Sequence, residues 1–157
     1  MEEKEFAARI WEARQTLFRV CRAQLASPHD REDAVQETLE RAWRKRKQLR
    51  SDAYLLTWLI RILLNVCHDM QRSGKRIVPV EQIELSGEER NQDGALRDAL
   101  GALEERYRLP VVLHYIEGYP VRQVAQMLRL PEGTVKTRMK RGRQKLEAIL
   151  NEEVFEA

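Results

Sequence analysis

Apolar residues recur at intervals of three and four along most of the chain, which is the spacing of one face of an α-helix. The first such stripe spans residues 6–25 and predicts one long amphipathic helix. Ser27 is placed to cap a second helix, with Pro28 at its first position. The buried side of this second helix is predicted to comprise Val35, Leu39, Ala42 and Trp43.

A third stripe predicts a helix over residues 53–73, after a polar loop at residues 47–52. Gly74 is placed to end this helix, because glycine is favoured just beyond a helix C-terminus. Three amphipathic helices of this kind can bury one common core, so the first half of the chain is predicted to form a small bundle. The apolar face of the third helix consists of Leu55, Leu56, Leu59, Ile62, Leu63, Val66 and Met70.

The second half of the chain is predicted to contain four further helices. Leu96, Leu100 and Leu103 mark the first of them. Proline is accepted at the start of a helix, and three prolines mark the starts of the other three. Pro110 is expected to open a helix over residues 111–117, Pro120 one over residues 121–128, and Pro131 a last helix with Val135, Met139, Leu146 and Ile149 on its apolar face. No strand-like alternation occurs, so the predicted fold class is all-α.

Charge divides the 157-residue chain into three parts. Residues 1–75 carry a net charge of +4, residues 76–94 carry −3 and residues 95–157 carry +2. The middle part lacks helical periodicity and contains Pro79 and Gly87, so it is interpreted as a flexible acidic linker between two small domains. Residues 41–50 and residues 134–146 each contain six cations. One such run is often a solvated helix face, but one in each domain favours a polyanionic partner.

Residues 120–146 have the spacing of a helix-turn-helix, with Ala125 and Val135 at the close crossing. Arg129 stands in the turn, where glycine is favoured in a left-handed conformation, and therefore predicts a turn that avoids this conformation. The alternative is a helical hairpin with a basic solvent side. If the second helix enters a major groove, its candidate DNA contacts are Thr134, Lys136, Thr137, Arg138, Lys140, Arg141, Arg143 and Gln144.

These segments resemble two regions of bacterial sigma factors of the extracytoplasmic-function (ECF) group of the sigma-70 family. Residues 117–146 are similar to region 4, and the run Leu-Pro-Glu-Gly-Thr-Val-Lys-Thr-Arg at residues 130–138 is the most specific part. Residues 31–43 are similar to region 2, as are residues 58–65 with Asp69 and Arg72. The resemblance covers residues 10–150 and keeps the family's order. It implies a region 2 domain at residues 1–75 and a region 4 domain at residues 95–157.

The resemblance implies a subunit that binds core RNA polymerase and directs promoter recognition and melting. It places polymerase docking on Asp33, Gln36 and Glu37, and recognition of the −35 promoter element on the last helix. Capture of the −10 strand needs a basic surface with exposed aromatic rings. Its candidate residues are Arg50, Tyr54, Trp58, Arg61 and Asn65, although a structural role is equally compatible with Trp58. The family also implies an anti-sigma factor as a partner.

The sequence predicts neither a catalytic site nor a metal site nor a cofactor. The acids near Asp33 suit a helix N-terminus, and the two cysteines, Cys21 and Cys67, fall in apolar stripes. The N-terminal residues do not resemble a secretory signal and the longest apolar run is too short to span a bilayer, so a cytoplasmic protein without membrane insertion is expected. Two alternatives remain open: a degenerate sigma-like interaction protein and a stand-alone helix-turn-helix regulator.

Overall fold

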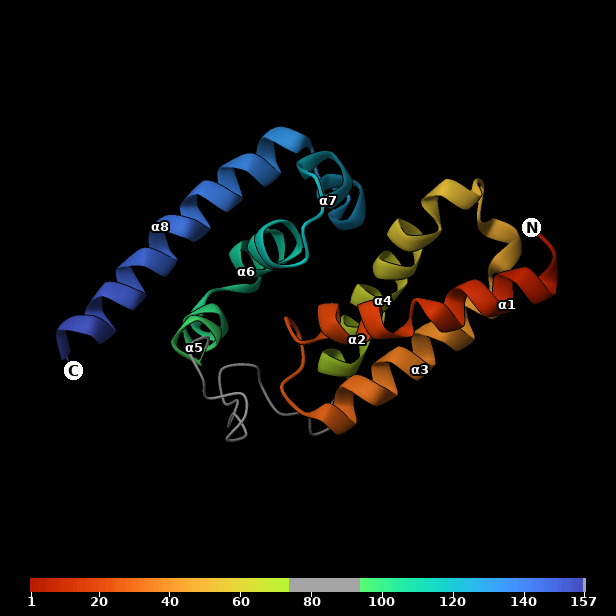
Figure 1. Ribbon diagram of the computed structural model, residues 1–157, viewed down its shortest axis with the longest axis horizontal. Coiled ribbons are helices and arrows are strands. Elements are labelled where there is room, and N and C mark those ends of the chain that lie inside the picture. Colours follow the sequence, from red (N-terminus) through yellow and green to blue (C-terminus); the bar gives the residue numbers. More distant parts are fainter. Residues whose placement is uncertain (74–93, 157) are drawn as a thin grey trace. The chain divides into compact units, whose positions relative to one another are not determined.

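The computed structural model describes residues 1–73 and 94–156, with side chains up to residue 152. The chain divides into two compact units, Met1–Val78 and Pro79–Ala157. Within the described residues every regular element is a helix (Figure 1), which confirms the predicted all-α class. Gly74 and all of the predicted linker except Gly94 lie outside the described residues.

The first predicted helix is divided into two. α1 spans Glu3–Glu12 and α2 spans Arg14–Cys21. Ala13 lies between them with ψ near −10°, yet the Leu17 N–H still donates to its carbonyl oxygen at 3.0 Å, so α2 continues the path of α1. The prediction that the helix extends to Leu25 is wrong. After Cys21 the chain tightens into turns in which an N–H donates to the carbonyl oxygen three residues earlier.

α3 spans Pro28–Arg44 and begins as predicted. The Ser27 hydroxyl oxygen accepts a hydrogen bond from the Asp30 N–H at 3.4 Å, with Pro28 at the first helical position. The placement of Trp43 on the buried side is wrong, because its side chain is 37% exposed. Ala42 already faces the core, and the next residue on a helix is turned by about 100°.

α4 spans Leu55–Arg72 and packs against both α2 and α3, which confirms the predicted bundle (Figure 1). Two short 3₁₀ turns, η1 (Arg46–Gln48) and η2 (Asp52–Tyr54), occupy the segment between α3 and α4. α4 supplies more of the core than any other helix of this unit. Its fully or nearly fully buried residues are Leu55, Thr57, Leu59, Ile60, Ile62, Leu63, Leu64, Val66 and Cys67.

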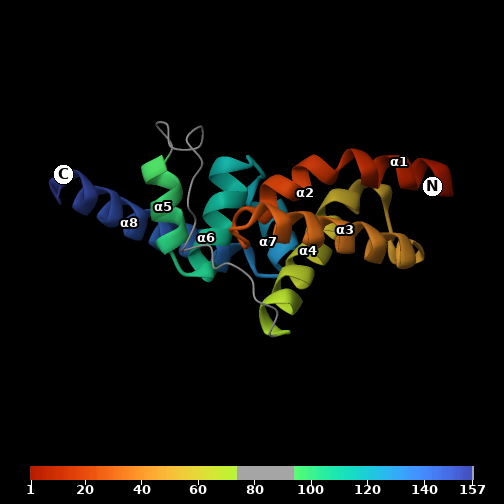
Figure 2. The ribbon, with the colours of Figure 1, turned by 90° about the horizontal axis from the view of Figure 1, so that it is seen from below.

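The second unit is built around α8 (Glu132–Glu156), a single long helix that Figure 1 shows along its length and Figure 2 shows with its C-terminal part in clear view. α8 contacts the three other α-helices of this unit: α5 (Gly94–Ala102), α6 (Glu105–Val111) and α7 (Val121–Leu128). A π-helical turn, η4 (Val112–Ile116), follows α6 directly. The predicted set of four helices is present, but one of them starts at a different residue.

The prediction that Pro110 opens a helix is wrong. This proline lies inside α6, which begins five residues earlier at Glu105 after an extended residue, Glu104. Pro110 has no N–H to donate to the carbonyl four residues before it, and the helix widens into η4 two residues later. There the Glu117 N–H donates to the Val112 oxygen five residues back, at 2.9 Å.

α8 approaches α6 closely at Gly142, which is buried. A methyl group at this position would lie 2.8 Å from Cγ2 of Val111 and 3.3 Å from the carbonyl oxygen of Tyr107. The absence of a side chain therefore sets the distance between the two helices. The apolar stripe of α8 predicts Val135 and Met139 correctly as buried, but it does not reveal this contact.

Candidate functional site

α7 and α8 form the predicted helix-turn-helix. Ala125 of α7 and Val135 of α8 are both buried, as the close crossing requires. Pro120 is the residue before α7 and not its first helical residue, so the expected place of this proline is shifted by one position. The crossing fixes one face of α8 against α7 and leaves the opposite face in solvent.

The turn between the two helices contains a left-handed arginine. Arg129 has φ 57° and ψ 45°, and it is the only non-glycine residue with positive φ among the described residues. The expectation that the turn avoids this conformation is therefore wrong. The conformation lets the Leu130 N–H donate to the Ala125 oxygen at 3.0 Å, which closes α7. For a residue with a side chain it costs about 1–2 kcal/mol.

The outer face of α8 carries the predicted DNA contacts. Lys136, Thr137, Lys140, Arg141, Arg143 and Gln144 are exposed, whereas Thr134 and Arg138 are half-buried. None of the cations on this face forms an ion pair with another described residue. The face therefore presents concentrated positive charge that no carboxylate of the described chain neutralises.

Two side chains of this face are positioned by contacts within the unit. The Thr137 hydroxyl donates to the Gly133 carbonyl at 3.0 Å, so its oxygen keeps its acceptor capacity. The Arg143 guanidinium lies 5.6 Å from the ring centroid of Tyr115, which is itself 48% exposed. Both contacts leave the polar groups accessible.

A second candidate surface lies on η2 and α4 in the first unit. Tyr54 is 51% exposed, and Arg50 and Asn65 are also exposed. Trp58 is half-buried and packs edge-on against Phe6, with ring centroids 6.2 Å apart. Tyr54 is therefore the more accessible ring, while Trp58 contributes to packing and retains an accessible part.

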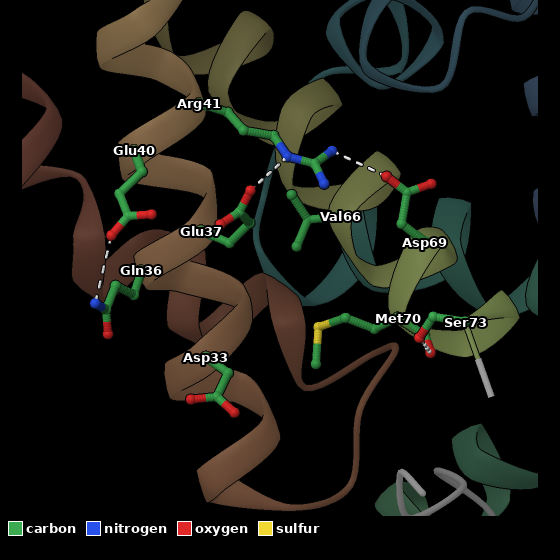
Figure 3. Close-up of a pocket in the computed structure, with 9 residues that line it drawn as sticks. All are labelled: Asp33, Gln36, Glu37, Glu40, Arg41, Val66, Asp69, Met70 and Ser73. Carbon is green, nitrogen blue, oxygen red and sulfur yellow. Dashed lines mark hydrogen bonds and ion pairs between the residues drawn. The ribbon is translucent and has the colours of Figure 1, made fainter. Parts of the chain in front are cut away.

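The three predicted polymerase-binding residues line one open pocket of about 540 Å³ between α3 and α4 (Figure 3). Four carboxylates surround it, and Val66 and Met70 form its apolar floor. The contribution of α4 could not be predicted from the sequence, because spacing along one helix does not show which residues of a second helix lie beside it. The lining residues are Asp33, Gln36, Glu37, Glu40, Arg41, Val66, Asp69, Met70 and Ser73.

Arg41 connects the two helices across this pocket. Its Nε donates to Oε1 of Glu37 at 2.9 Å, and its Nη1 donates to Oδ2 of Asp69 at 3.0 Å (Figure 3). The hydrogen bond from Arg41 lowers the pKa of Glu37. Hydrogen bonds from Arg41 and then from Arg72 lower the pKa of Asp69. Both carboxylates therefore remain ionised to lower pH than usual. Asp33 is exposed, and its Oδ2 lies 3.6 Å from Nε2 of His29.

An apolar groove between α1–α2 and α3 adjoins this pocket. Gln36 lines both the pocket and the groove, and Leu39 and Trp11 lie along the groove. Trp11 is 59% exposed, and the Arg14 guanidinium lies 4.1 Å from the centroid of its ring system. In the sequence, the groove is indicated only by a large aromatic residue, Trp11, next to the buried Ile10.

The described residues contain no metal-binding cluster and no membrane-spanning helix. No group of three or more His, Cys, Asp or Glu side chains that could hold a metal ion occurs among residues 1–73 and 94–152. Cys21 and Cys67 are buried free thiols with their Sγ atoms 3.7 Å apart. Among the helices of the described residues, none is both long and apolar enough to cross a bilayer.

The two units match two successive regions of one protein family. Residues 10–77 match sigma-70 region 2, and residues 93–146 match sigma-70 region 4. These regions include the pocket, the η2–α4 surface and the helix-turn-helix. The class of protein defined by the fold and its surfaces is therefore that of the sigma factors.

Individual relatives narrow the class to one group. The ECF RNA polymerase sigma factor SigM of Mycobacterium tuberculosis is 33% identical over 139 residues, which cover 85% of this chain and 71% of SigM. The structure of CnrH with the cytosolic domain of CnrY aligns at a TM-score of 0.76 and 26% identity, over 96% of this chain and 90% of CnrH. RpoE from Bartonella quintana aligns at a TM-score of 0.78 and 24% identity, over 94% and 98% of the two chains.

The chain belongs to the ECF group of the sigma-70 family. It is accordingly a sigma factor that directs transcription initiation by RNA polymerase. The two alternatives, a degenerate interaction protein and a stand-alone regulator, are not favoured, because the chain matches both sigma-70 regions and ECF sigma factors over most of its length. The family in general is not enzymatic.

Proposed function

We propose that the two units divide promoter recognition between them, with region 2 at residues 1–75 and region 4 at residues 95–157. The first unit docks on core RNA polymerase and holds the melted −10 strand. The second binds the −35 element as duplex DNA. The single observation that carries this proposal is the exposed face of α8, whose cations have no acidic partner among the described residues.

On this proposal α8 enters the major groove of the −35 element. Lys140, Thr137 and Gln144 point away from the α7 contact and are placed to recognise base edges. Arg138, Arg141 and Arg143 lie beside them and suit the phosphates along the groove. Thr134 and Lys136, in the first turns of α8, complete the proposed contact surface.

The −10 strand is proposed to lie across η2 and α4. Exposed Tyr54 offers a ring on which an unstacked base can rest, and the accessible part of Trp58 offers a second. Arg50 and Arg61 supply positive charge for the backbone, and Asn65 supplies donors and an acceptor for a base edge. The melted strand thus meets stacking and charge on one surface.

Polymerase docking is proposed at the α3–α4 pocket. Asp33, Gln36 and Glu37 give it negative charge and hydrogen-bonding groups, and the adjoining groove at Leu39 gives it apolar area. An interface core that is apolar with a polar rim is the usual arrangement for protein association. A basic segment of the polymerase with some apolar side chains fits this combination.

Three further properties follow from the proposed role. CnrH was solved with CnrY, and RpoE was solved with the anti-sigma factor NepR, so an anti-sigma factor is also proposed as a partner of this chain. The chain is proposed to have no catalytic activity and no cofactor, because its role is binding. A cytoplasmic location is proposed, because the bacterial polymerase and chromosome are there.

The proposed orientation of α8 predicts different effects for two substitutions. Lys140→Ala removes a group directed at base edges, so it should change −35 sequence preference, with about 1–3 kcal/mol less discrimination at the contacted base pair. Arg143→Ala removes a phosphate contact, so it should weaken binding to all sequences and reduce the salt slope by about one. The measurement is selection from randomised −35 elements by holoenzyme, with salt titrations of the selected duplex.

Arg106→Ala is a suitable control for loss of one positive charge. Arg106 is an exposed residue of α6 that pairs with Glu104 at 3.1 Å and is not among the proposed DNA contacts. It should change neither sequence preference nor salt slope. An unchanged preference in Lys140→Ala would show that the proposed orientation of α8 is wrong.

A further inference from the structure

We propose that Arg129 is an additional phosphate-binding residue, located in the turn of the helix-turn-helix and not on the recognition helix. The inference rests on the proposed binding of duplex DNA by α8. It extends the contact surface to a residue that the sequence analysis considered only as an unfavourable turn residue.

Arg129 adopts a left-handed conformation that its residue type disfavours. The turn needs a left-handed residue, since this conformation lets α7 close through the hydrogen bond from the Leu130 N–H to the Ala125 carbonyl. Glycine meets this need without strain, because it has no Cβ. Arginine at the same position makes the turn less stable, and strained residues of this kind concentrate at functional sites.

The side chain of Arg129 makes no polar or ring contact within the described residues. Arg129 is exposed, and its guanidinium makes no hydrogen bond, ion pair or ring contact with any described residue. The half-buried arginines Arg14 and Arg46, in contrast, stack on Trp11 and Trp43. The Arg129 guanidinium is therefore available to a partner outside the described residues.

Arg129 also lies immediately before the helix that is proposed to enter the major groove. In a helix-turn-helix the N-terminal residues of the second helix contact base edges. The turn immediately before them therefore lies beside the sugar–phosphate backbone that borders the groove. Arg129 is three residues before Glu132, where α8 begins, and its long side chain carries five donors that suit a phosphate. The partner it fits is a backbone phosphate of the −35 duplex.

The test compares Arg129→Gly with Arg129→Lys in the full chain, assembled with core polymerase for the binding measurements. Arg129→Gly removes both strain and charge. It should raise the melting temperature of the second unit by about 4–8 °C, measured calorimetrically, and weaken binding to the selected −35 duplex by about threefold to tenfold. Its salt slope should fall by about one. Arg129→Lys should keep the wild-type slope and melting temperature.

Opposite effects on stability and binding distinguish this role from a purely structural one. A more stable Arg129→Gly variant that binds the duplex with wild-type affinity and slope would overturn the inference. Failure of the proposed function has a different result: Lys140→Ala and Arg143→Ala would also leave duplex binding unchanged. Arg106→Ala again serves as the control for charge and should match the wild type in every measurement.

Discussion

Gly142→Ala is expected to lower the free energy of unfolding of the second unit by about 1–3 kcal/mol. The new methyl group would lie 2.8 Å from Cγ2 of Val111 and 3.3 Å from the Tyr107 carbonyl oxygen. Neither atom is the far end of a flexible side chain, so α6 and α8 must move apart. The measurement is denaturant unfolding of the full chain, monitored by far-ultraviolet circular dichroism.

Gly133→Ala is the matched control in the same helix. A Cβ at position 133 has no heavy atom within 4 Å, and alanine favours a helix more than glycine does. This substitution should therefore raise the free energy of unfolding by up to about 1 kcal/mol. Equal effects of the two substitutions would contradict the close packing of α6 on α8.

Asp33→Lys is expected to weaken binding to core RNA polymerase by about tenfold to 100-fold. Asp33 lies on the α3–α4 pocket and is exposed, so reversing its charge should not disturb the core. Glu37 is less suitable for this test, because it also holds Arg41 and its loss would loosen the link between α3 and α4. The measurement is equilibrium binding of labelled chain to core polymerase at fixed ionic strength.

The control for this variant is Glu5→Lys on α1. Glu5 is exposed and lies outside the pocket, and its substitution by lysine changes the net charge by the same amount. It should leave polymerase affinity within about twofold of the wild type, since surface charges remote from an interface are largely screened. A polymerase affinity of Asp33→Lys equal to that of Glu5→Lys would refute docking at this pocket.

Local sequence signals predicted much of the fold. Ser27 and Pro28 set the start of α3 through chemistry confined to three residues, so the sequence was sufficient there. Pro110 shows the limit of the same approach. A proline can start a helix or be accommodated within one, and the choice depended on the preceding residues from Glu105 onward.

The remaining errors concern packing between helices. Gly142 is defined by a neighbour on α6, and no spacing within α8 reveals how closely that neighbour approaches. Arg129 adopts the left-handed conformation because the α7–α8 crossing imposes it, even though its own residue type disfavours it. Tertiary structure thus determines a close approach at Gly142 that the sequence does not show, and at Arg129 it overrides the preference of the residue type.

For the candidate surfaces as well, features within one helix could be predicted and contacts between helices could not. The helical wheel of α8 correctly predicted the exposed face, because one buried stripe on a helix determines the opposite side. On α3 the family resemblance implied Asp33, Gln36 and Glu37, but the spacing along α3 gave no sign that Asp69 lies beside them. Asp69 comes from α4 and meets Arg41 only when the bundle forms.

The most direct test is a footprint of holoenzyme, made from core RNA polymerase and this chain, on promoters selected from genomic DNA. The account predicts protection of an upstream duplex together with permanganate-reactive thymines downstream at the −10 element. Tyr54→Ala should keep the upstream protection and lose most of the reactivity, because stacking contributes about 1–3 kcal/mol per base. Undiminished downstream reactivity in Tyr54→Ala, or protection confined to the downstream element, would contradict the proposed division between the two units.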